Sequence, residues 1–298
     1  MRQKSWGVLQ AIILVGVGCG TIGGLSVLQS PSQHSSRDRL SPLHAGRLGG
    51  VAHAEGQYTG NCDCVVGTLP WTANTTTCPS TAPAGVGLVC LTKTIVWNPG
   101  VGGNAITIAL NGPVTLDLGG YSLICTGSNC GSSTGILLDS GGAGTVYNLA
   151  VQNGSVGNFS QNVSITNHAQ YIRLKDLFLT GGTNGIITTA TGNSYVEVMG
   201  STITSASNDG INFAGTGVLF AHNNTFQNNG NGIYVSSTGG YGVIDANYFA
   251  GGTYAITCST GTTTKISHNL QITGSGYSSN CTGQSYYYNG GSAENSNQ

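Results

Sequence analysis

The chain is 298 residues long, has a net charge of −1 and is only 6% charged, so it lacks the positive surface that binding to nucleic acid or acidic lipid requires. Its 49 glycines, with abundant Asn, Ser and Thr, favour turns and strands over helices. Apolar residues recur throughout in short bursts, which indicates many short strands rather than a disordered chain. We therefore expect a folded all-β protein with no nucleic-acid partner.

The N-terminal segment, residues 1–54, has the pattern of an export signal followed by a linker. Arg2 and Lys4 precede an apolar run over residues 6–28. This run is also long enough to span a bilayer, for which about 20 residues suffice, and Gly18-Cys19 has a weak likeness to a lipidation site. We expect a secreted or cell-surface protein, which contacts a membrane only through this segment if the segment is not cleaved.

The next segment, residues 55–103, contains four cysteines and is predicted to be an N-terminal cap. An even number of cysteines in an exported chain favours disulfides. The alternative is a metal site at Cys62 and Cys64, but this spacing is unusual for zinc and no pair of His residues is close in sequence. We expect no metal, no other cofactor, and disulfides among Cys62, Cys64, Cys78, Cys90, Cys125, Cys130, Cys258 and Cys281.

Residues 104–298 consist of a repeat and a short C-terminal tail. Similar sequence segments begin at Tyr171, Tyr195, Val218, Tyr241 and Thr264, at spacings of 24, 23, 23 and 23 residues. A fixed period of this size is typical of a solenoid, in which each unit buries its apolar side chains against its neighbours. Each repeat contains three short strand patterns, so stacked coils would form parallel sheets with strands about 4.8 Å apart.

Two columns of equivalent residues support this alignment. Alternating apolar residues predict an inward-facing column at Ile106/Ile108, Ile136/Leu138, Val163/Ile165, Ile186/Thr188, Ile211/Phe213, Ile233/Val235 and Ile256/Cys258. A second column, at a turn, contains Gly154, Leu177, Ser201, Asn224, Asn247 and Asn269. Asn at this turn can tolerate left-handed backbone geometry, and its amide can bond to the Asn one coil away.

The two columns carry a resemblance to a known family. The pattern hydrophobic-x-hydrophobic-x-x-Asn-x-hydrophobic, followed by Asn-Gly-Ile-x-hydrophobic, resembles the repeats of the pectin-lyase-like superfamily over residues 104–285. The resemblance implies an all-β, right-handed parallel β-helix with about seven to eight coils and a disulfide-rich N-terminal cap. It does not fix the function, because this fold hosts lyases, hydrolases, epimerases, adhesins and structural proteins.

The resemblance implies enzymatic residues that this sequence lacks at the matching positions. Pectate lyases place calcium ligands and a catalytic Arg on the outer face of the strand after the Asn-Gly corner. The residues predicted on that face here are uncharged: Thr107, Leu137, Ser164, Ile187, Asn212, Tyr234 and Thr257. Polygalacturonases use three Asp on neighbouring coils, whereas Asp209 has no Asp partner and is interpreted as a turn residue. We expect no calcium-dependent lyase activity.

Charged residues gather instead on the strand before the Asn column, at Arg173, Lys175, Glu197, His222 and Asp245. Arg173 and Glu197 are predicted to be neighbours one coil apart, as are His222 and Asp245. We interpret these residues as surface pairs between strands, and the competing hypothesis is a catalytic strip.

Other candidate residues lie outside this strip. His168 and His268 are placed at turns, apart from any cluster of metal ligands. Tyr171, Tyr195 and Tyr241 recur at the start of successive repeats, and Tyr234 lies on the uncharged face. A row of tyrosines forms either a structural ladder or a flat sugar-binding strip, so these four residues are the candidates for binding.

Two disulfides can be assigned from the repeat. Cys258 and Cys281 are 23 residues apart and occupy matching inward positions, with Ile256 aligned to Ser279. Cys125 and Cys130 are expected to close a short loop, while the pairing of the four cap cysteines stays open.

The sequence as a whole favours an exported, non-catalytic β-helix protein with a structural or glycan-binding role outside the cell. Its expected partner is extracellular polysaccharide or a second copy of itself. The alternative is a polysaccharide lyase or hydrolase that uses the charged strip.

Overall fold

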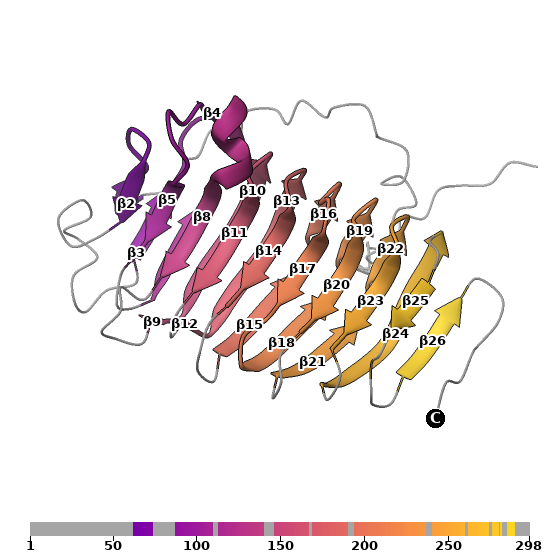
Figure 1. The fold of residues 1–298 in the computed structure, drawn as a ribbon. Helices are drawn as coiled ribbons and strands as arrows, with labels where there is room; N and C mark the ends of the chain where they lie inside the picture. Colours follow the sequence, from indigo (N-terminus) through magenta and orange to yellow (C-terminus); the bar gives the residue numbers. More distant parts are fainter. Residues whose placement is uncertain are drawn as a thin grey trace, which may run out of the picture. The chain divides into compact units, whose positions relative to one another are not determined.

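The described chain consists mainly of short β-strands (Figure 1). The computed structural model describes residues 62–73, 87–109, 113–139, 146–166, 169–189, 194–236, 240–259, 262–273, 276–279, 281 and 285–289, all within the compact unit Ala52–Gln298. Residues 1–54 lie outside the described residues, so their role in export stays a prediction. Within the described ranges, no helix is long and apolar enough to cross a membrane.

Two parallel sheets are built from successive coils (Figure 1). Sheet A has 15 strands: β1 (Cys64–Val65), β3 (Gly87–Cys90), β4 (Ile95–Trp97), β6 (Val114–Asp117), β7 (Ser122–Cys125), β10 (Leu149–Gly157), β13 (Ile172–Thr180), β15 (Ser194–Met199), β16 (Thr202–Thr204), β18 (Gly217–His222), β19 (Thr225–Gln227), β21 (Gly240–Asp245), β22 (Tyr248–Ala250), β24 (Thr263–Thr273) and β26 (Ser285–Asn289). Sheet B has nine: β2 (Trp71–Ala73), β5 (Asn104–Ile108), β8 (Thr134–Asp139), β11 (Gln161–Thr166), β14 (Asn184–Thr188), β17 (Asp209–Phe213), β20 (Asn231–Val235), β23 (Tyr254–Cys258) and β25 (Gly276–Ser279).

Two short elements complete the described structure. Strands β9 (Val146–Tyr147) and β12 (Ala169–Gln170) pair with each other, and η3 (Ser128–Ser132) is a 3₁₀ helix. Each coil in the middle of the stack contributes two strands to sheet A and one to sheet B, as in β18, β19 and β20. The prediction of three short strands per repeat is confirmed, and the protein is a parallel β-helix of about seven coils.

The predicted inward column forms the core. Ile211, Ile233 and Ile256 are paired in consecutive strands of sheet B, and all three are completely buried. Phe226 stacks on Phe249 one coil away, with ring centroids 4.9 Å apart and planes 9° from parallel. Each fully buried side chain of this kind contributes about 1.5–3 kcal/mol. A stack of coils therefore shares one continuous core that a single coil could not bury.

The predicted Asn ladder is confirmed. Nδ2 of Asn224 donates to Oδ1 of Asn247 at 3.0 Å, and Nδ2 of Asn247 donates to Oδ1 of Asn269 at 2.9 Å. The same two amides also donate to the backbone carbonyls of Val198 and Ala221, at 2.9 and 2.8 Å. Because these residues are buried, the ladder satisfies polar atoms that would otherwise destabilise the interior.

Left-handed backbone geometry at this turn belongs to the residue before each ladder residue. Asn223, Ala246 and His268 have φ angles of 56°, 52° and 51°. The ladder side chain must point into the core, so the sharp bend falls on its exposed neighbour. The ladder Asn residues therefore do not use the left-handed geometry that Asn can tolerate.

The last coil corrects the sequence alignment by one residue. Tyr241 is paired with Thr263 rather than Thr264, and Ile256 with Ser278 rather than Ser279. Equivalent residues are thus 22 positions apart here, whereas Val218 and Tyr241 in the preceding pair of coils are 23 apart.

The assigned disulfides are confirmed. Cys258 and Cys281 are bonded with their Cα atoms 4.8 Å apart, and Cys125 and Cys130 with theirs 5.7 Å apart. Cys62 is bonded to Cys90. Cys64 is also disulfide-bonded, and Cys78 lies outside the described residues. Strands β1 and β2, in the segment predicted as a cap, pair with β3 and β5 and so begin the two sheets.

Candidate functional site

The charged residues lie on the outer side of β13, β15, β18 and β21. The strand register pairs Arg173 with Glu197, as predicted, and Nε of Arg173 lies 2.7 Å from Oε2 of Glu197. The Arg173 side chain is 62% exposed and the Glu197 side chain only 17%. The carboxylate is therefore held against the sheet while the guanidinium remains open to solvent.

Glu197 has a second basic partner. Nε2 of His222 lies 3.1 Å from Oε1 of Glu197, and the Asn223 amide lies 3.3 Å from Nδ1 of His222. The amide nitrogen can only donate, so Nδ1 accepts and the neutral ring carries its proton on Nε2, facing Glu197. Burial raises the pKa of Glu197, but the hydrogen bonds and charges of Arg173 and His222 outweigh burial and leave the pKa below its ordinary value.

Asp245 forms a separate cluster in the next coils. It is paired in register with His222, as predicted, yet its Oδ1 lies 2.6 Å from Oγ of Ser267 and 2.8 Å from Nδ1 of His268. Burial raises the pKa of Asp245, whereas Ser267, His268 and the charge of His222 lower it, and the net result is a lowered pKa.

His268 was missed as a member of the strip. The sequence places it at a turn apart from the charged residues, but its left-handed backbone turns the ring back toward Asp245. Its side chain is 80% exposed, so Nε2 can reach a bound molecule. A signal existed in the sequence, because His268 directly follows Ser267, which aligns with Asp245. His168 lies outside the described residues.

Lys175 does not join the Glu197 cluster. Its backbone partner one coil on is Met199, and its ammonium lies 3.4 Å from Oδ2 of Asp176. Both side chains of this pair are nearly half exposed. The five candidates thus form two carboxylate-centred clusters and a separate surface ion pair.

A cluster of aromatic rings lies beside the charged residues. Tyr171 lies 6.0 Å from Tyr195 between ring centroids, and Tyr195 stacks on Phe220 at 4.8 Å. Tyr195 and Glu197 alternate along β15 and both point outward, about 7 Å apart along the strand. Phe220 is paired in register with Glu197, so its ring contacts Tyr195 diagonally, from the column of the charged residues. We name this surface, made of Tyr171, Tyr195, Phe220, Arg173, Glu197, His222, Asp245 and His268, the outer strip.

The four tyrosine candidates are not all brought together. Tyr241 is 37% exposed but is paired with Val218, which interrupts the row. Tyr234 lies on β20 in sheet B, on the predicted uncharged face and away from the outer strip. Val218 takes the place that a continuous tyrosine ladder would have given to a tyrosine, and Phe220 is paired with Glu197 instead.

Asp209 is not a simple turn residue, which corrects the interpretation from the sequence. It begins β17, is 1% exposed, and accepts hydrogen bonds from the amides of Asn208, Asn212 and Asn231 at 2.8, 2.7 and 2.8 Å. Burial raises the pKa of Asp209, and the bonds from Asn231 and Asn212 only partly compensate. The register pairs it with Asn184 and Asn231, so it has Asn on both neighbouring coils.

The carboxylates of the outer strip suit ionic contacts better than acid catalysis. A glycosidase needs one carboxyl group that is still protonated near neutral pH and a second one nearby. The pKa values of Glu197 and Asp245 are both lowered, so both groups are ionised. Within the described part of the chain, no group of three or more His, Cys, Asp or Glu is placed to hold a metal ion.

Comparisons with known proteins add little to this picture. No protein-family model and no curated protein matches the chain. Among solved structures, it is similar to the enzymatically active domain of tailspike protein 2 of bacteriophage CBA120, with 11% identity and a TM-score of 0.39 over 67% of this chain. The chain spans 36% of that structure's length. A likeness this weak carries no argument about function, and the assignment of the fold rests on the strand pairing itself.

Proposed function

We propose that the protein is an exported β-helix that binds an extended glycan along the outer strip, without cleaving it. The observation that carries the proposal is the position of Tyr195, which lies between Tyr171 and Phe220 on the outer side of sheet A. Rings that recur on successive coils, about 4.8 Å apart, offer a repeated contact to a linear polymer.

The neighbouring charges complement such a contact. A sugar presents an apolar face to a ring and hydroxyl groups at its margin. Arg173 and His268 have exposed donors, and the Glu197 and Asp245 carboxylates are ionised acceptors. Rings and ionic groups on the same outer face supply both kinds of interaction to one chain of sugars.

The disulfides support a location outside the reducing cytosol. Cys62–Cys90, Cys125–Cys130 and Cys258–Cys281 require an oxidising compartment to form and persist. This agrees with the export pattern of residues 1–54.

The test is a binding and turnover assay of the full chain against a panel of soluble neutral and acidic polysaccharides. We expect retention on at least one polysaccharide without release of fragments. Tyr195→Ala should weaken binding about tenfold, because it removes the central ring of the aromatic cluster. Tyr234→Ala is the matched control on the other sheet and should bind normally. Fragment release that is lost in Glu197→Gln would support the alternative, a polysaccharide-acting enzyme, and no binding to any member would refute the proposal.

A further inference from the structure

The first coil of the stack is one strand short. Its strands β1 and β2 pair with β3 and β5, whereas β4 pairs only with β7 among the described strands. Residues 66–70 alone link β1 to β2, while residues 91–103, which include β4, link β3 to β5 in the next coil. The first coil is therefore too short to place a strand on β4, and one edge of β4 stays open.

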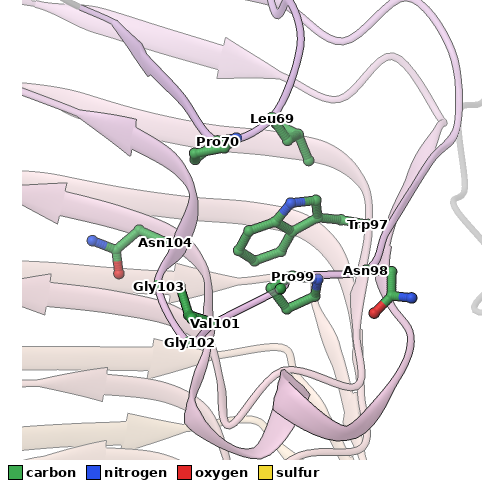
Figure 2. Close-up of a pocket in the computed structure, with 10 residues that line it drawn as sticks. Leu69, Pro70, Trp97, Asn98, Pro99, Val101, Gly102, Gly103 and Asn104 are labelled. Atoms are coloured by element: carbon green, nitrogen blue, oxygen red, sulfur yellow. The ribbon is translucent and has the colours of Figure 1, made fainter.

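An open hollow of about 620 Å³ lies beside β4 at this place (Figure 2). Figure 2 shows the Trp97 indole, at the end of β4, between Pro70 of the short link and Pro99. The side chains of Asn98 and Asn104 point away from the indole, and none of the lining residues is ionisable. The hollow therefore suits an aromatic or apolar side chain.

The inward side chains of β4 are less covered than their equivalents one coil on. Ile95 and Trp97 are partly exposed. Their partners in register on β7, Leu123 and Cys125, are only 0% and 2% exposed. A strand added to the open edge of β4 would cover Ile95 and Trp97 and remove their apolar surface from water.

The backbone of β4 has hydrogen-bonding groups directed at this edge. The backbone N–H of Thr126 donates to the carbonyl of Trp97 at 2.8 Å, so the backbone groups of Trp97 face β7. Successive residues of a strand direct their backbone groups to opposite sides, so the N–H and C=O of Val96 face the open edge. An edge of this kind is a template for one more strand.

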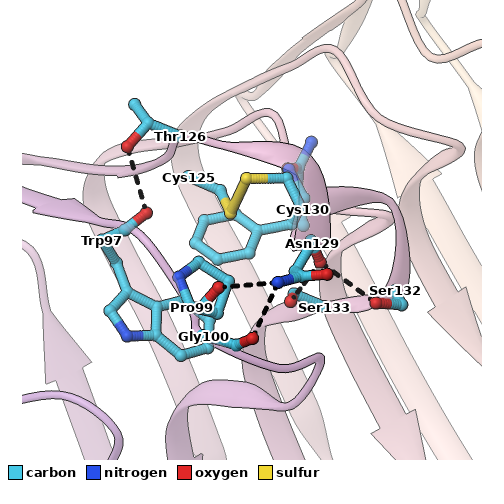
Figure 3. The surroundings of a disulfide bond; sticks show 11 residues. Trp97, Pro99, Gly100, Cys125, Thr126, Asn129, Cys130, Ser132 and Ser133 are labelled. Atoms are coloured by element: carbon cyan, nitrogen blue, oxygen red, sulfur yellow. Dashed lines mark hydrogen bonds between the residues drawn. A yellow bond between two sulfur atoms is a disulfide. The ribbon is translucent and has the colours of Figure 1, made fainter.

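The loop that walls the hollow is fixed in place (Figure 3). Nδ2 of Asn129 donates to the carbonyls of Pro99 and Gly100, at 3.0 and 2.9 Å. Asn129 is next to Cys130, which is bonded to Cys125. The hollow is therefore preformed, which lowers the entropic cost of docking a segment there.

The chain enters the stack beside this open edge. Cys62, the first described residue, is bonded to Cys90, and their Cα atoms are 5.9 Å apart. Cys90 ends β3, and only residues 91–94 separate it from β4. Residues just before Cys62 that follow β4 must therefore run antiparallel to it. Residues 55–61 can extend up to about 23 Å, which exceeds the length of the short strand β4.

We infer that the segment just before Cys62 supplies the missing strand, antiparallel to β4, with the Tyr58 ring in the hollow against Trp97. Tyr58 is the one Phe, Trp or Tyr between residues 29 and 61. A tyrosine suits an open hollow, because its ring is buried while its hydroxyl stays at the mouth in water. The tether at Cys62 also gives this segment a high effective concentration at β4, which a separate partner would lack.

The register of the added strand follows from the directions of the side chains. With Tyr58 opposite Trp97, Thr59 lies opposite Val96, and the two residues exchange N–H to C=O hydrogen bonds in both directions. Their β-branched side chains then face outward as a cross-strand pair. This inference does not depend on glycan binding. It extends the folded cap upstream of Cys62 and fills the hollow from within the chain.

Two variants separate the edge from the hollow. Val96→Pro removes an N–H that faces the open edge, so the pairing of β4 with β7 is kept while the added strand loses a bond. Val96→Thr keeps the N–H and is its matched control. Gly103→Leu fills the hollow, since a Cβ atom added at Gly103 would meet no atom within 4 Å. Gly131→Leu is its control, because Gly131 in η3 is equally open and does not line the hollow.

The experiment is hydrogen exchange of the full chain, followed by mass spectrometry of peptides that cover residues 29–54 and 55–61. We expect amide protons in residues 55–61 that exchange about tenfold or more slowly than those of residues 29–54. This protection should be lost in Val96→Pro, Gly103→Leu and Tyr58→Ala, and kept in Val96→Thr and Gly131→Leu. Thermal melting of each variant confirms that it is folded.

Equally fast exchange of the two segments in the natural protein would overturn the inference. Protection that survives Val96→Pro would exclude pairing with β4, and protection that survives Gly103→Leu or Tyr58→Ala would exclude the tyrosine from the hollow. Protection that disappears on dilution of the protein would show that a second copy supplies the strand, which also refutes the inference.

Discussion

Two corners of the coil use buried polar side chains in opposite ways. At the corner between β18 and β19 and its equivalents, Asn224, Asn247 and Asn269 form a ladder that repeats from coil to coil. At the corner that opens β17, Asp209 occurs once and is surrounded by the amides of Asn208, Asn212 and Asn231.

The difference follows from the hydrogen-bonding capacity of the two groups. An amide has both a donor and an acceptor, so identical amides can stack without limit. An ionised carboxylate only accepts, so a copy of it one coil away would repel it. A solenoid can therefore repeat Asn at a buried corner, while a buried Asp must stand alone among donors.

The largest effect is expected when a carboxylate is placed in the core, where there are no hydrogen-bond donors. Ile233→Asp puts an acid in the core between Ile211 and Ile256, and the cost of several kcal/mol should unfold a protein whose total stability is about 5–15 kcal/mol. Tyr234→Asp, one residue on and half-exposed, should fold. Circular dichroism melting curves distinguish the two, and identical melting would show that the inward and outward faces are misassigned.

A smaller effect is expected from breaking the ladder. Asn247→Ala removes bonds to Asn224, Asn269 and the carbonyl of Ala221, and leaves buried polar groups unpaired. We expect a loss of about 2–4 kcal/mol in the free energy of unfolding, measured in denaturant. Gln227→Ala, on the exterior of β19, should cost almost nothing. A loss under about 0.5 kcal/mol for Asn247→Ala would mean that the ladder fills space rather than stabilising the stack.

The pH dependence of stability should have opposite signs at two carboxyl groups. The folded-state pKa of Asp209 is raised, so its contribution to stability falls as pH rises from its ordinary value of 3.8 through the folded-state value. Relative to Asp209→Asn, the natural protein should lose stability on going from acid to neutral pH, by less than the Asn247 effect.

Glu197 provides the matched control for that experiment. Its folded-state pKa is lowered, so its contribution is present above its ordinary value of 4.5 and is lost as pH falls through the folded-state value. The difference between the natural protein and Glu197→Gln should therefore shrink in acid. Parallel pH profiles for the two variants would contradict this account.

The smallest predicted effect is an increase in stability. Ala246, just before the ladder, has a left-handed backbone that costs an L-residue about 1–2 kcal/mol. Ala246→Gly removes that strain but increases the freedom of the unfolded chain, so we expect a net gain of about 0.5 kcal/mol. Ala250→Gly in β22 should instead destabilise. Equal losses in both variants would exclude strain at position 246.

Much of the fold could be predicted because it repeats. The inward column, the Asn ladder and the pairing of Cys258 with Cys281 all follow from equivalent positions one coil apart. The error at Thr264 arose because spacing assumes turns of constant length, and the turn before β24 is one residue shorter.

The site was predicted less well, because its key contacts lie at bends. Periodicity assigns a side chain in a strand to a face, but says nothing of a residue with a left-handed backbone. His268 was therefore separated from Asp245, although the two are in contact. Asp209 looked like a turn residue because its three donors come from two coils and are spread over 24 positions, Asn208 to Asn231.

The disulfide at the last complete coil affects how the stack of coils unfolds. A linear array opens from its ends, since terminal units have a neighbour on only one side. The bond between Cys258 and Cys281 joins β23 to the chain just beyond β25. If β25 separates from the stack, the disulfide keeps it tethered to β23. Opening must therefore either include β23 or be limited to a short loop. Amide protons in β25 should consequently exchange as slowly as those in the interior coils. After reduction of the disulfide, they should exchange faster, like those of a terminal strand.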